Sequence, residues 1–271
     1  MPYSDLKYLK AVNDEGVLTI TLNRPDKRNA MNVEMTLEME QLLTAVGYDQ
    51  AVRAVVIRGE GAGFCAGMDM QDFFESSQRD EITLRRARES ANNWRVRLLR
   101  LLPQPVIALV HGFCYGGAFG IVEGCDIAFA ADDTKFALSE TNFGHFPGGP
   151  VNKSISRVMT PRSASYYALS GKAFDGKEAE LNGLVTRSFP AAELENEVYT
   201  LAKEFVAKDA IALQFTKETL QYVEPMSWDG VLNFNAAKFA ELKALQAGKP
   251  SARAAAVESF LAGKSKPGLG G

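Results

Sequence analysis

Apolar residues in the first 60 positions predict a strand, a helix and a second strand. Residues 17–22 (VLTITL) alternate β-branched and aliphatic side chains after a turn-like sequence at 13–16, which is typical of a strand. Residues 33–43 have helical spacing, and the apolar run at 54–57 (AVVI) ends at Gly59, as expected for a strand covered on both faces. This order and spacing indicate a crossover unit.

A long amphipathic helix is predicted next. Between residues 84 and 101 the apolar positions recur at steps of three and four, so one face of the helix is expected to pack on the core. Pro103 and Pro105 end this helix. Arginines occupy mostly the other positions, and we interpret them as a solvated face rather than a phosphate-binding strip: Arg85, Arg86, Arg88, Arg95, Arg97 and Arg100.

The remaining pattern predicts two more strands and then mainly helices. Residues 106–110 and 126–130 read as strands that flank a glycine-rich turn and short helix at 112–124. An α-rich stretch covers 163–181, and after Pro190 the pattern is helical, with breaks at Pro225 and 248–250. We therefore predict an α/β fold, with a mixed core over residues 1–195 and a helical region over residues 196–271.

Composition narrows the function classes. The 271 residues are 46% hydrophobic and 23% charged, which excludes disordered, collagen-like and disulfide-scaffold proteins. With 30 basic and 33 acidic residues the net charge is −3, so we expect no nucleic-acid partner and no anionic membrane partner. Three cysteines without a C-x-x-C pair or a histidine at ligand spacing indicate reduced thiols and no metal site.

Both ends of the chain and its longest apolar run predict a cytoplasmic protein. The first residues lack the apolar stretch of a signal peptide, and the final Gly-Leu-Gly-Gly is neither an anchor nor an address. The run at 105–130 is interrupted by His111, Glu123 and Asp126, which indicates buried core rather than a membrane span.

Two glycine-rich segments follow predicted strands. The first, residues 59–69, contains a G-x-G-x-x-A string that is open to two interpretations: a dinucleotide loop, or small residues that let a ligand lie against backbone N–H groups. The second, residues 111–120, is either an oxyanion-binding turn or a close-packed turn. Two such loops together favour paired N–H donors. His111, at the end of a strand, is expected to be a hydrogen-bonded core residue.

Glu140 and His145 are the candidate acid–base residues. Glu140 is a single carboxylate in an apolar, small-residue stretch, where burial would raise its pKa and suit it to proton transfer. A satisfied structural carboxylate is an equally good interpretation. His145 lies in a glycine-rich loop, and histidine titrates near neutral pH, although a structural or surface role is the commoner one for such a residue.

A series of motifs runs in order along nearly the whole chain: residues 23–31 (NRPDKRNAM), 64–69, Gly116-Gly117 before Asp126, Glu140 ahead of Gly144 and Pro147-Gly148, and 171–174 with 183–185. Together they resemble the crotonase (enoyl-CoA hydratase/isomerase) superfamily. Residues 66–69, 113–117, 138–142 and 266–269 most resemble its hydroxycinnamoyl-CoA (feruloyl-CoA) hydratase-lyases.

The resemblance implies a fold, an assembly and a set of roles. It implies a spiral of β-β-α turns, a helical C-terminal region that trimerises, and a homotrimer or dimer of trimers. The N–H groups of Met68 and Gly117 match the donors that hold the thioester oxygen of an acyl-CoA, and Glu140 matches the carboxylate that handles water and proton. Lys27, Ala66 and Ser139 match positions near CoA. Further candidates for the substrate site, taken from the residues themselves, are Phe73, Tyr115, Phe143 and His145, although aromatic residues at such positions are more often core. No cofactor is implied beyond the CoA of the substrate.

Two departures from the family pattern affect the expected reaction. Ordinary enoyl-CoA hydratases use a second glutamate where this chain has Gly120, and the hydratase-lyases also lack it. The tyrosines that grip a phenol are replaced, one of them by Phe73. We therefore expect hydration of an unsaturated acyl-CoA, with aldehyde-forming cleavage as a second step. The alternatives are a general hydratase/isomerase, an acyl-CoA hydrolase, and a non-catalytic acyl-CoA- or RNA-binding relative.

Overall fold

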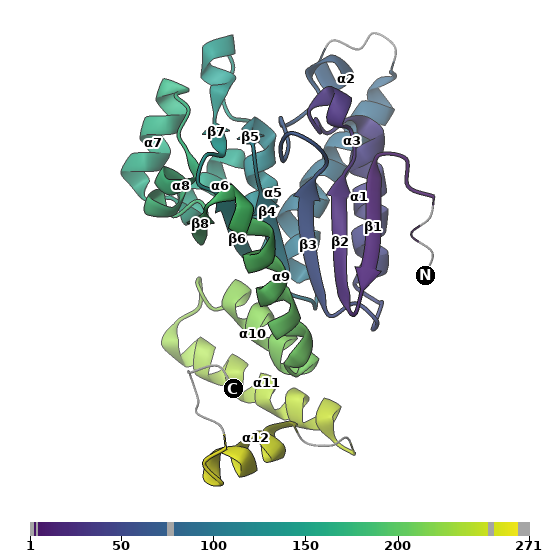
Figure 1. Cartoon of the computed structure of the whole chain (residues 1–271), viewed down its shortest axis with the longest axis vertical. Coiled ribbons are helices and arrows are strands. Elements are labelled where there is room, and N and C mark those ends of the chain that lie inside the picture. The colour runs from purple at the N-terminus through teal and green to yellow at the C-terminus, as the bar shows by residue number, and fades with distance from the viewer. Residues whose placement is uncertain (1–2, 4, 75–78, 249–251, 265–271) are drawn as a thin grey trace. The chain divides into compact units, whose positions relative to one another are not determined.

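The computed structural model describes residues 3, 5–74, 79–248 and 252–264, in two compact units of residues 1–207 and 208–271 (Figure 1). The expected boundary after residue 195 falls inside helix α9 (Ala191–Ala207), which belongs to the first unit. The motif at 266–269 lies outside the described residues.

A six-stranded sheet forms the centre of the first unit, in the order β1-β2-β3-β4-β6-β8. Its strands are β1 (Leu9–Asp14), β2 (Val17–Leu22), β3 (Ala54–Gly59), β4 (Val106–Val110), β6 (Ile127–Ala131) and β8 (Arg187–Phe189). Strand β1 pairs antiparallel with β2, and every other pairing in this sheet is parallel. The four predicted strands and the crossover between β2 and β3 are confirmed.

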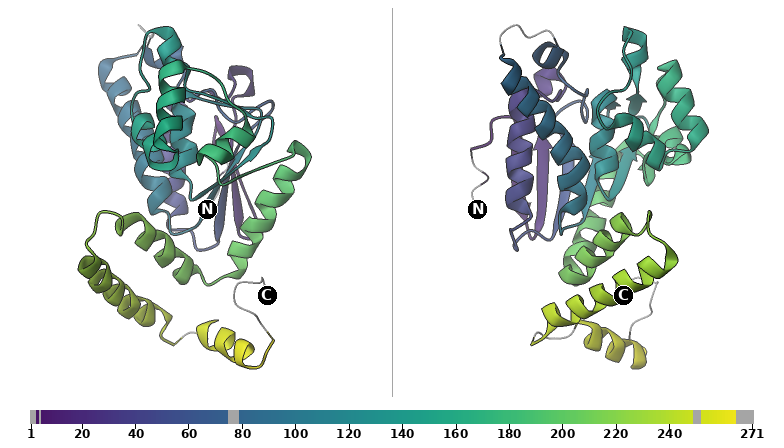
Figure 2. Two further views of the ribbon diagram at one scale, coloured as in Figure 1. Left: turned by 90° about the vertical axis from the view of Figure 1, so that its left-hand side faces the viewer. Right: turned by 180° about the vertical axis from the view of Figure 1, so that it is seen from behind.

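Helices cover both faces of this sheet, which explains why its central strands β3 and β4 are almost entirely apolar. Val55 and Ile57 of β3 pack in a core cluster with Met39 of α1 (Val33–Val46). The alternate residue Val56 points to the opposite face, where it shares a second cluster with Val198 of α9. Figure 2 shows α1 and α3 (Glu81–Asn92) together on one side of the sheet.

A second, smaller layer completes the repeating pattern. Strand β5 (Phe113–Tyr115) follows β4 and pairs in parallel with β7 (Lys135–Ala137), which follows β6. Isolated bridges from Cys65 to Cys114 and from Phe136 to Phe174 extend this layer on both sides. Strand β4 of the first layer, strand β5 of the second layer and helix α5 (Phe119–Gly124) follow one another along the chain. They form one of the expected β-β-α turns.

The long predicted helix is present but changes its winding. After α3 the chain forms a π-helical segment, η2 (Asn93–Leu98), and then α4 (Leu99–Leu101). A π-turn adds a residue per turn and so shifts the face on which the following side chains lie. Arg95, in this segment, is only 4% exposed. The prediction that it belongs to a solvated face is wrong.

The remaining elements connect these layers or form the second unit. In the first unit they are η1 (Pro25–Lys27), α2 (Met70–Phe74), η3 (Gly116–Ala118), η4 (Ser139–Phe143), α6 (Val151–Val158), α7 (Pro161–Ser170) and α8 (Gly176–Asn182). The second unit contains α10 (Ala210–Tyr222), α11 (Trp228–Gln246) and α12 (Ala252–Leu261). Lys238 of α11 pairs with Glu218 of α10 at 2.8 Å. No helix in the described ranges is long and apolar enough to cross a membrane.

Candidate active site

The two glycine-rich loops lie side by side at the carboxyl ends of β3 and β4. The N–H of Phe64 donates to the carbonyl oxygen of His111 (2.9 Å), and that of Cys65 donates to Phe113 (3.2 Å). In return, the N–H of Tyr115 donates to the carbonyl oxygen of Cys65 (3.0 Å). These bonds bring together segments about 50 positions apart, an arrangement that the sequence pattern only suggested.

Gly67 allows the two loops to approach within contact distance. Its φ is +91°, and a Cβ atom there would lie 2.8 Å from the carbonyl oxygen of Tyr115 and 3.2 Å from the nitrogen of Gly117. Gly63 permits a similar approach, because a Cβ there would lie 2.5 Å from the ring of Phe113. The glycines of the first loop therefore serve close packing, which favours the small-residue interpretation over a dinucleotide loop.

Met68 and Gly117 supply two backbone donors at this contact. The Cγ atom of Met68 is 3.1 Å from the position that a Cβ of Gly117 would take. Within the described part of the chain, the backbone N–H of neither residue donates to a protein acceptor. Unpaired amides held close together are suited to an oxyanion, because they need no reorganisation when negative charge develops.

The carboxyl group of Glu140 lies beside the second loop. Its Oε1 atom is 2.9 Å from where a Cβ of Gly116 would be, and Gly116 itself has a φ of +51°. The Oε2 atom is buried, and no described residue provides it with a hydrogen-bond partner. Burial raises the pKa of this carboxyl, and the charge of His145 partly opposes that shift. A half-buried carboxyl with one unpartnered oxygen, lying against the second donor loop, is placed for proton transfer.

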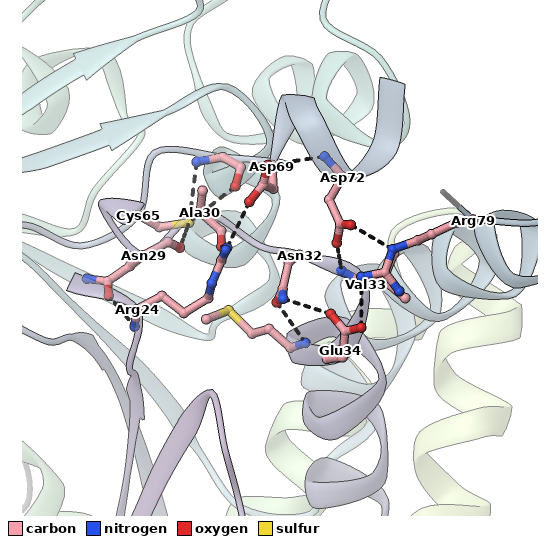
Figure 3. A network of polar contacts seen from close by, with 12 residues as sticks. Arg24, Asn29, Ala30, Asn32, Val33, Glu34, Cys65, Asp69, Asp72 and Arg79 are labelled. Carbon is pink, nitrogen blue, oxygen red and sulfur yellow. Dashed lines mark hydrogen bonds and ion pairs between the residues drawn. The ribbon is translucent and has the colours of Figure 1, made fainter. Parts of the chain in front are cut away.

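A polar network fixes the chain on both sides of Met68 (Figure 3). The N–H of Met31 donates to Gly67 (2.8 Å), and that of Asp69 donates back to Met31 (2.9 Å). The Asp69 carboxylate accepts from Arg24 at 3.0 Å. Sequence analysis did not identify Arg24 or Asp69 individually, although both lie in the motifs that carry the family resemblance.

The residues expected near CoA lie partly together. Lys27 is exposed at the end of η1. Arg28, which follows Lys27, accepts a hydrogen bond at its carbonyl oxygen from the N–H of Ala66 (3.0 Å). The loop with Lys27 and the donor loop are therefore neighbours. Ser139 is half-buried and adjoins Glu140 at the start of η4.

The aromatic and histidine candidates lie in different environments. Phe73 is 2% exposed in a small core cluster against which Met68 packs, whereas Phe143 is 78% exposed. The ring of Tyr115 stacks on Phe113 with centroids 5.5 Å apart. His145 is exposed and stacks on Phe146, and its backbone N–H donates to the carbonyl oxygen of Glu140 (3.0 Å).

His111 was expected to be a hydrogen-bonded core residue. Its Nε2 atom hydrogen bonds the carbonyl oxygen of Gly61 (3.0 Å), as predicted, but the residue is half-buried rather than part of the core. Among the described residues there is no group of three His, Cys, Asp or Glu side chains that would hold a metal ion.

Comparison with known proteins gives a consistent result. The family model described as enoyl-CoA hydratase/isomerase matches residues 13–255. The hydroxycinnamoyl-CoA hydratase-lyase of Pseudomonas fluorescens is 34% identical over 97% of this chain and 95% of its own length. Human mitochondrial Delta(3,5)-Delta(2,4)-dienoyl-CoA isomerase is 33% identical over 86% of this chain and 73% of its own. The crystal structure of a putative enoyl-CoA hydratase from Streptomyces coelicolor superimposes with a TM-score of 0.87 at 27% identity, covering 100% of this chain and 97% of that one.

Proposed function

The chain belongs to the enoyl-CoA hydratase/isomerase family, and on that premise we propose that it adds water to the double bond of an α,β-unsaturated acyl-CoA. The observation that carries the proposal is the placement of the Glu140 carboxyl against Gly116, the residue that precedes Gly117 in the second donor loop. The donor loops and this carboxyl supply what the reaction needs: stabilisation of an enolate and a site for the proton.

The proposed sequence of steps uses these groups in turn. The N–H groups of Met68 and Gly117 bind the thioester oxygen and stabilise the negative charge that develops there. The Glu140 carboxylate takes a proton from water as the oxygen attacks Cβ, and the protonated carboxyl then gives that proton to Cα of the enolate. Lys27, Ala66 and Ser139 are proposed to contact the CoA portion. The carboxylate handles the proton alone, because position 120 is a glycine.

A finer proposal is that the natural substrate is a p-hydroxycinnamoyl-CoA and that cleavage follows hydration. The similarity to a hydroxycinnamoyl-CoA hydratase-lyase over 97% of the chain supports it. In the cleavage step the Cα–Cβ bond breaks, the β-hydroxyl proton passes to Glu140, and an aryl aldehyde leaves. The acetyl-CoA enolate left behind is then protonated. Isomerisation is the second candidate, because the human dienoyl-CoA isomerase is 33% identical.

We expect p-hydroxycinnamoyl-CoA to be consumed faster than crotonyl-CoA, with aldehyde and acetyl-CoA as products. An electron-rich aryl group stabilises positive charge at Cβ and so helps a single carboxylate to activate water. Chromatography of timed reaction mixtures measures both substrates and products. Detection of the hydrated thioester without aldehyde would show a hydratase that lacks lyase activity. Detection of a double-bond isomer would show an isomerase, and release of free CoA would show a hydrolase. Failure to consume any acyl-CoA would contradict the proposed function and favour a non-catalytic relative.

We also propose that the protein is a cytoplasmic trimer or hexamer assembled through α11. Two large apolar side chains on this helix are strongly exposed, Leu232 at 66% and Phe239 at 61%, while Phe234 and Leu242 are half-buried. Exposed apolar groups of this size on one helix are typical of an interface.

Light scattering at micromolar concentration is expected to give the mass of a trimer or hexamer. The double variant Leu232→Glu/Phe239→Glu should shift the mass towards that of the monomer, because it buries charge at the interface. Ile82→Glu is the matched control, since Ile82 is 81% exposed in the other unit. A monomer at every concentration in the unsubstituted protein would contradict the proposed assembly.

A further inference from the structure

Arg95 carries a buried positive charge that the proposed reaction has not yet used. Its side chain is 4% exposed, and no described carboxylate lies within ion-pair distance of it. Its hydrogen bonds go to neutral acceptors, the carbonyl oxygens of Ala91 and Gly117 (both 2.8 Å) and, more weakly, Oδ1 of Asn92 (3.4 Å). Burial lowers its pKa to about 10, so the guanidinium remains protonated at neutral pH.

The guanidinium lies against Gly117, one member of the donor pair, and the side chain of Met68 approaches the same glycine. Nη1 of Arg95 is 3.1 Å from the position that a Cβ of Gly117 would take, and Cγ of Met68 is equally close to that point. The same side chain covers Gly120, whose Cβ position is 3.6 Å from Cδ and 3.7 Å from Nη1. Because residue 120 has no side chain, it cannot supply a carboxylate to neutralise this charge.

A buried charge without a counter-ion is costly, and it is expected where an anion arrives during function. The anion of the proposed reaction is the enolate, which forms at Met68 and Gly117. With 4% of its surface exposed, Arg95 has little area for direct contact with a substrate group, so its charge acts across a short distance. Its position in a π-helical segment is also typical of functional sites.

We propose that Arg95 is a positioning residue and fixed positive charge of the oxyanion site, which holds Gly117 in place and stabilises the enolate through space. This inference rests on the proposed acyl-CoA chemistry. It extends that chemistry by adding a cation, from a different element of the fold, to the two backbone donors.

The test uses acetoacetyl-CoA, whose enolate is visible by ultraviolet absorbance, bound to the full-length Glu140→Gln protein. In the Glu140→Gln background the Glu140 carboxylate no longer affects the enolate, so the effect of the Arg95 charge on the oxyanion site can be measured separately. Arg95→Gln retains an amide donor but no charge, Arg95→Lys retains the charge, and Arg97→Gln removes an exposed arginine of the same segment as the matched control.

We expect Arg95→Gln to lower the enolate fraction of the bound ligand by about 10- to 100-fold at fixed pH, the size expected of one charge a few ångströms away. Arg95→Lys should stay within about threefold of the parent, and Arg97→Gln should equal it. Equal losses in Arg95→Gln and Arg95→Lys would overturn the charge role, as would no loss in Arg95→Gln.

A second pair of variants tests the same charge with Arg95 intact, in case Arg95→Gln does not fold. Gly120→Asp places a carboxylate against the guanidinium and should lower the enolate fraction as Arg95→Gln does. Gly120→Ala adds only a methyl group at van der Waals contact and should not. Equal enolate fractions in these two variants would overturn the inference. If acetoacetyl-CoA binds but its enolate fraction is the same in all of these variants, only the inference about Arg95 is contradicted. If the protein neither binds acetoacetyl-CoA nor hydrates crotonyl-CoA, the proposed function is contradicted.

Discussion

Glu140→Gln is expected to lower kcat by at least 10²-fold while CoA-thioester binding stays within a few-fold of the unsubstituted protein. General acid–base catalysis typically contributes about 10²–10⁴-fold, and the amide preserves the shape of the carboxyl but cannot exchange the proton. Steady-state kinetics with crotonyl-CoA and calorimetric binding of butyryl-CoA measure the two quantities. Glu193→Gln, an exposed carboxylate on α9, is the matched control and should retain full activity.

Thermal unfolding of Glu140→Gln shows whether a loss of activity reflects the missing carboxylate or a destabilised fold. Burial raises the pKa of Glu140, so the folded state favours its protonated form. The stability contributed by that form is fully present below the usual carboxyl range and is lost as pH rises through the raised pKa. At neutral pH the unsubstituted protein therefore carries a penalty that a neutral glutamine lacks. We expect the variant's Tm to equal or exceed that of the parent at pH 7.5 and the difference to shrink towards pH 4.

The pH dependence of kcat/KM gives a third readout of the same group. If the Glu140 carboxylate is the base, kcat/KM should rise with pH along a limb that lies above the usual carboxyl range, because burial raises its pKa. Retention of more than about a tenth of kcat in Glu140→Gln would remove this residue from the acid–base role.

Gly67→Ala is expected to lower kcat by about 10²–10³-fold, the cost of losing one oxyanion donor. The added Cβ would meet the carbonyl oxygen of Tyr115 at 2.8 Å and the nitrogen of Gly117 at 3.2 Å. Both are backbone atoms, so the two loops must separate, and the N–H groups of Met68 and Gly117 can no longer converge. Steady-state kinetics should show the loss mainly in kcat.

Gly16→Ala controls for backbone strain in that experiment. Gly16 has the same φ of +91° in the hairpin between β1 and β2, but its added Cβ would meet the side chain of Arg53 at 3.2 Å, and that side chain can move. Both substitutions should lower the Tm, whereas only Gly67→Ala should lower kcat. Equal kcat values in the two variants would show that the close approach of the loops is not needed for activity.

The apolar pattern of the chain predicted the strands and helices whose side chains are buried at regular intervals. The strands at 54–57 and 106–110 were predictable because a strand covered on both faces is apolar along its length. The strand at 17–22 was predictable from its alternating β-branched and aliphatic residues. Glu140 was identifiable for a related reason, since a lone carboxylate among apolar and small residues is unusual in local sequence. The order of motifs along the chain also carries the resemblance to the family.

Short and exposed elements left no comparable signal. Strands β5, β7 and β8 have three residues each, too few to show an alternating pattern, and most residues of the edge strand β1 are at least partly exposed. Their positions follow from pairing with strands that are distant in sequence.

The groups that meet at the site are brought together by long-range packing, which leaves no local signal in the sequence. The contact of Gly67 with Gly117 depends on the parallel pairing of β3 with β4, which places both following loops at one edge of the sheet. Arg95 lies four residues after Ala91 and three before Leu98, at the margin of the apolar face, so helical spacing alone does not decide whether it is buried. Its packing against Gly117 and Gly120, which are distant in sequence, does. Phe73 likewise fits a binding position by motif, yet it packs inside a core cluster. Hydrophobic periodicity predicts whether a side chain is buried, whereas long-range packing determines which residues it contacts.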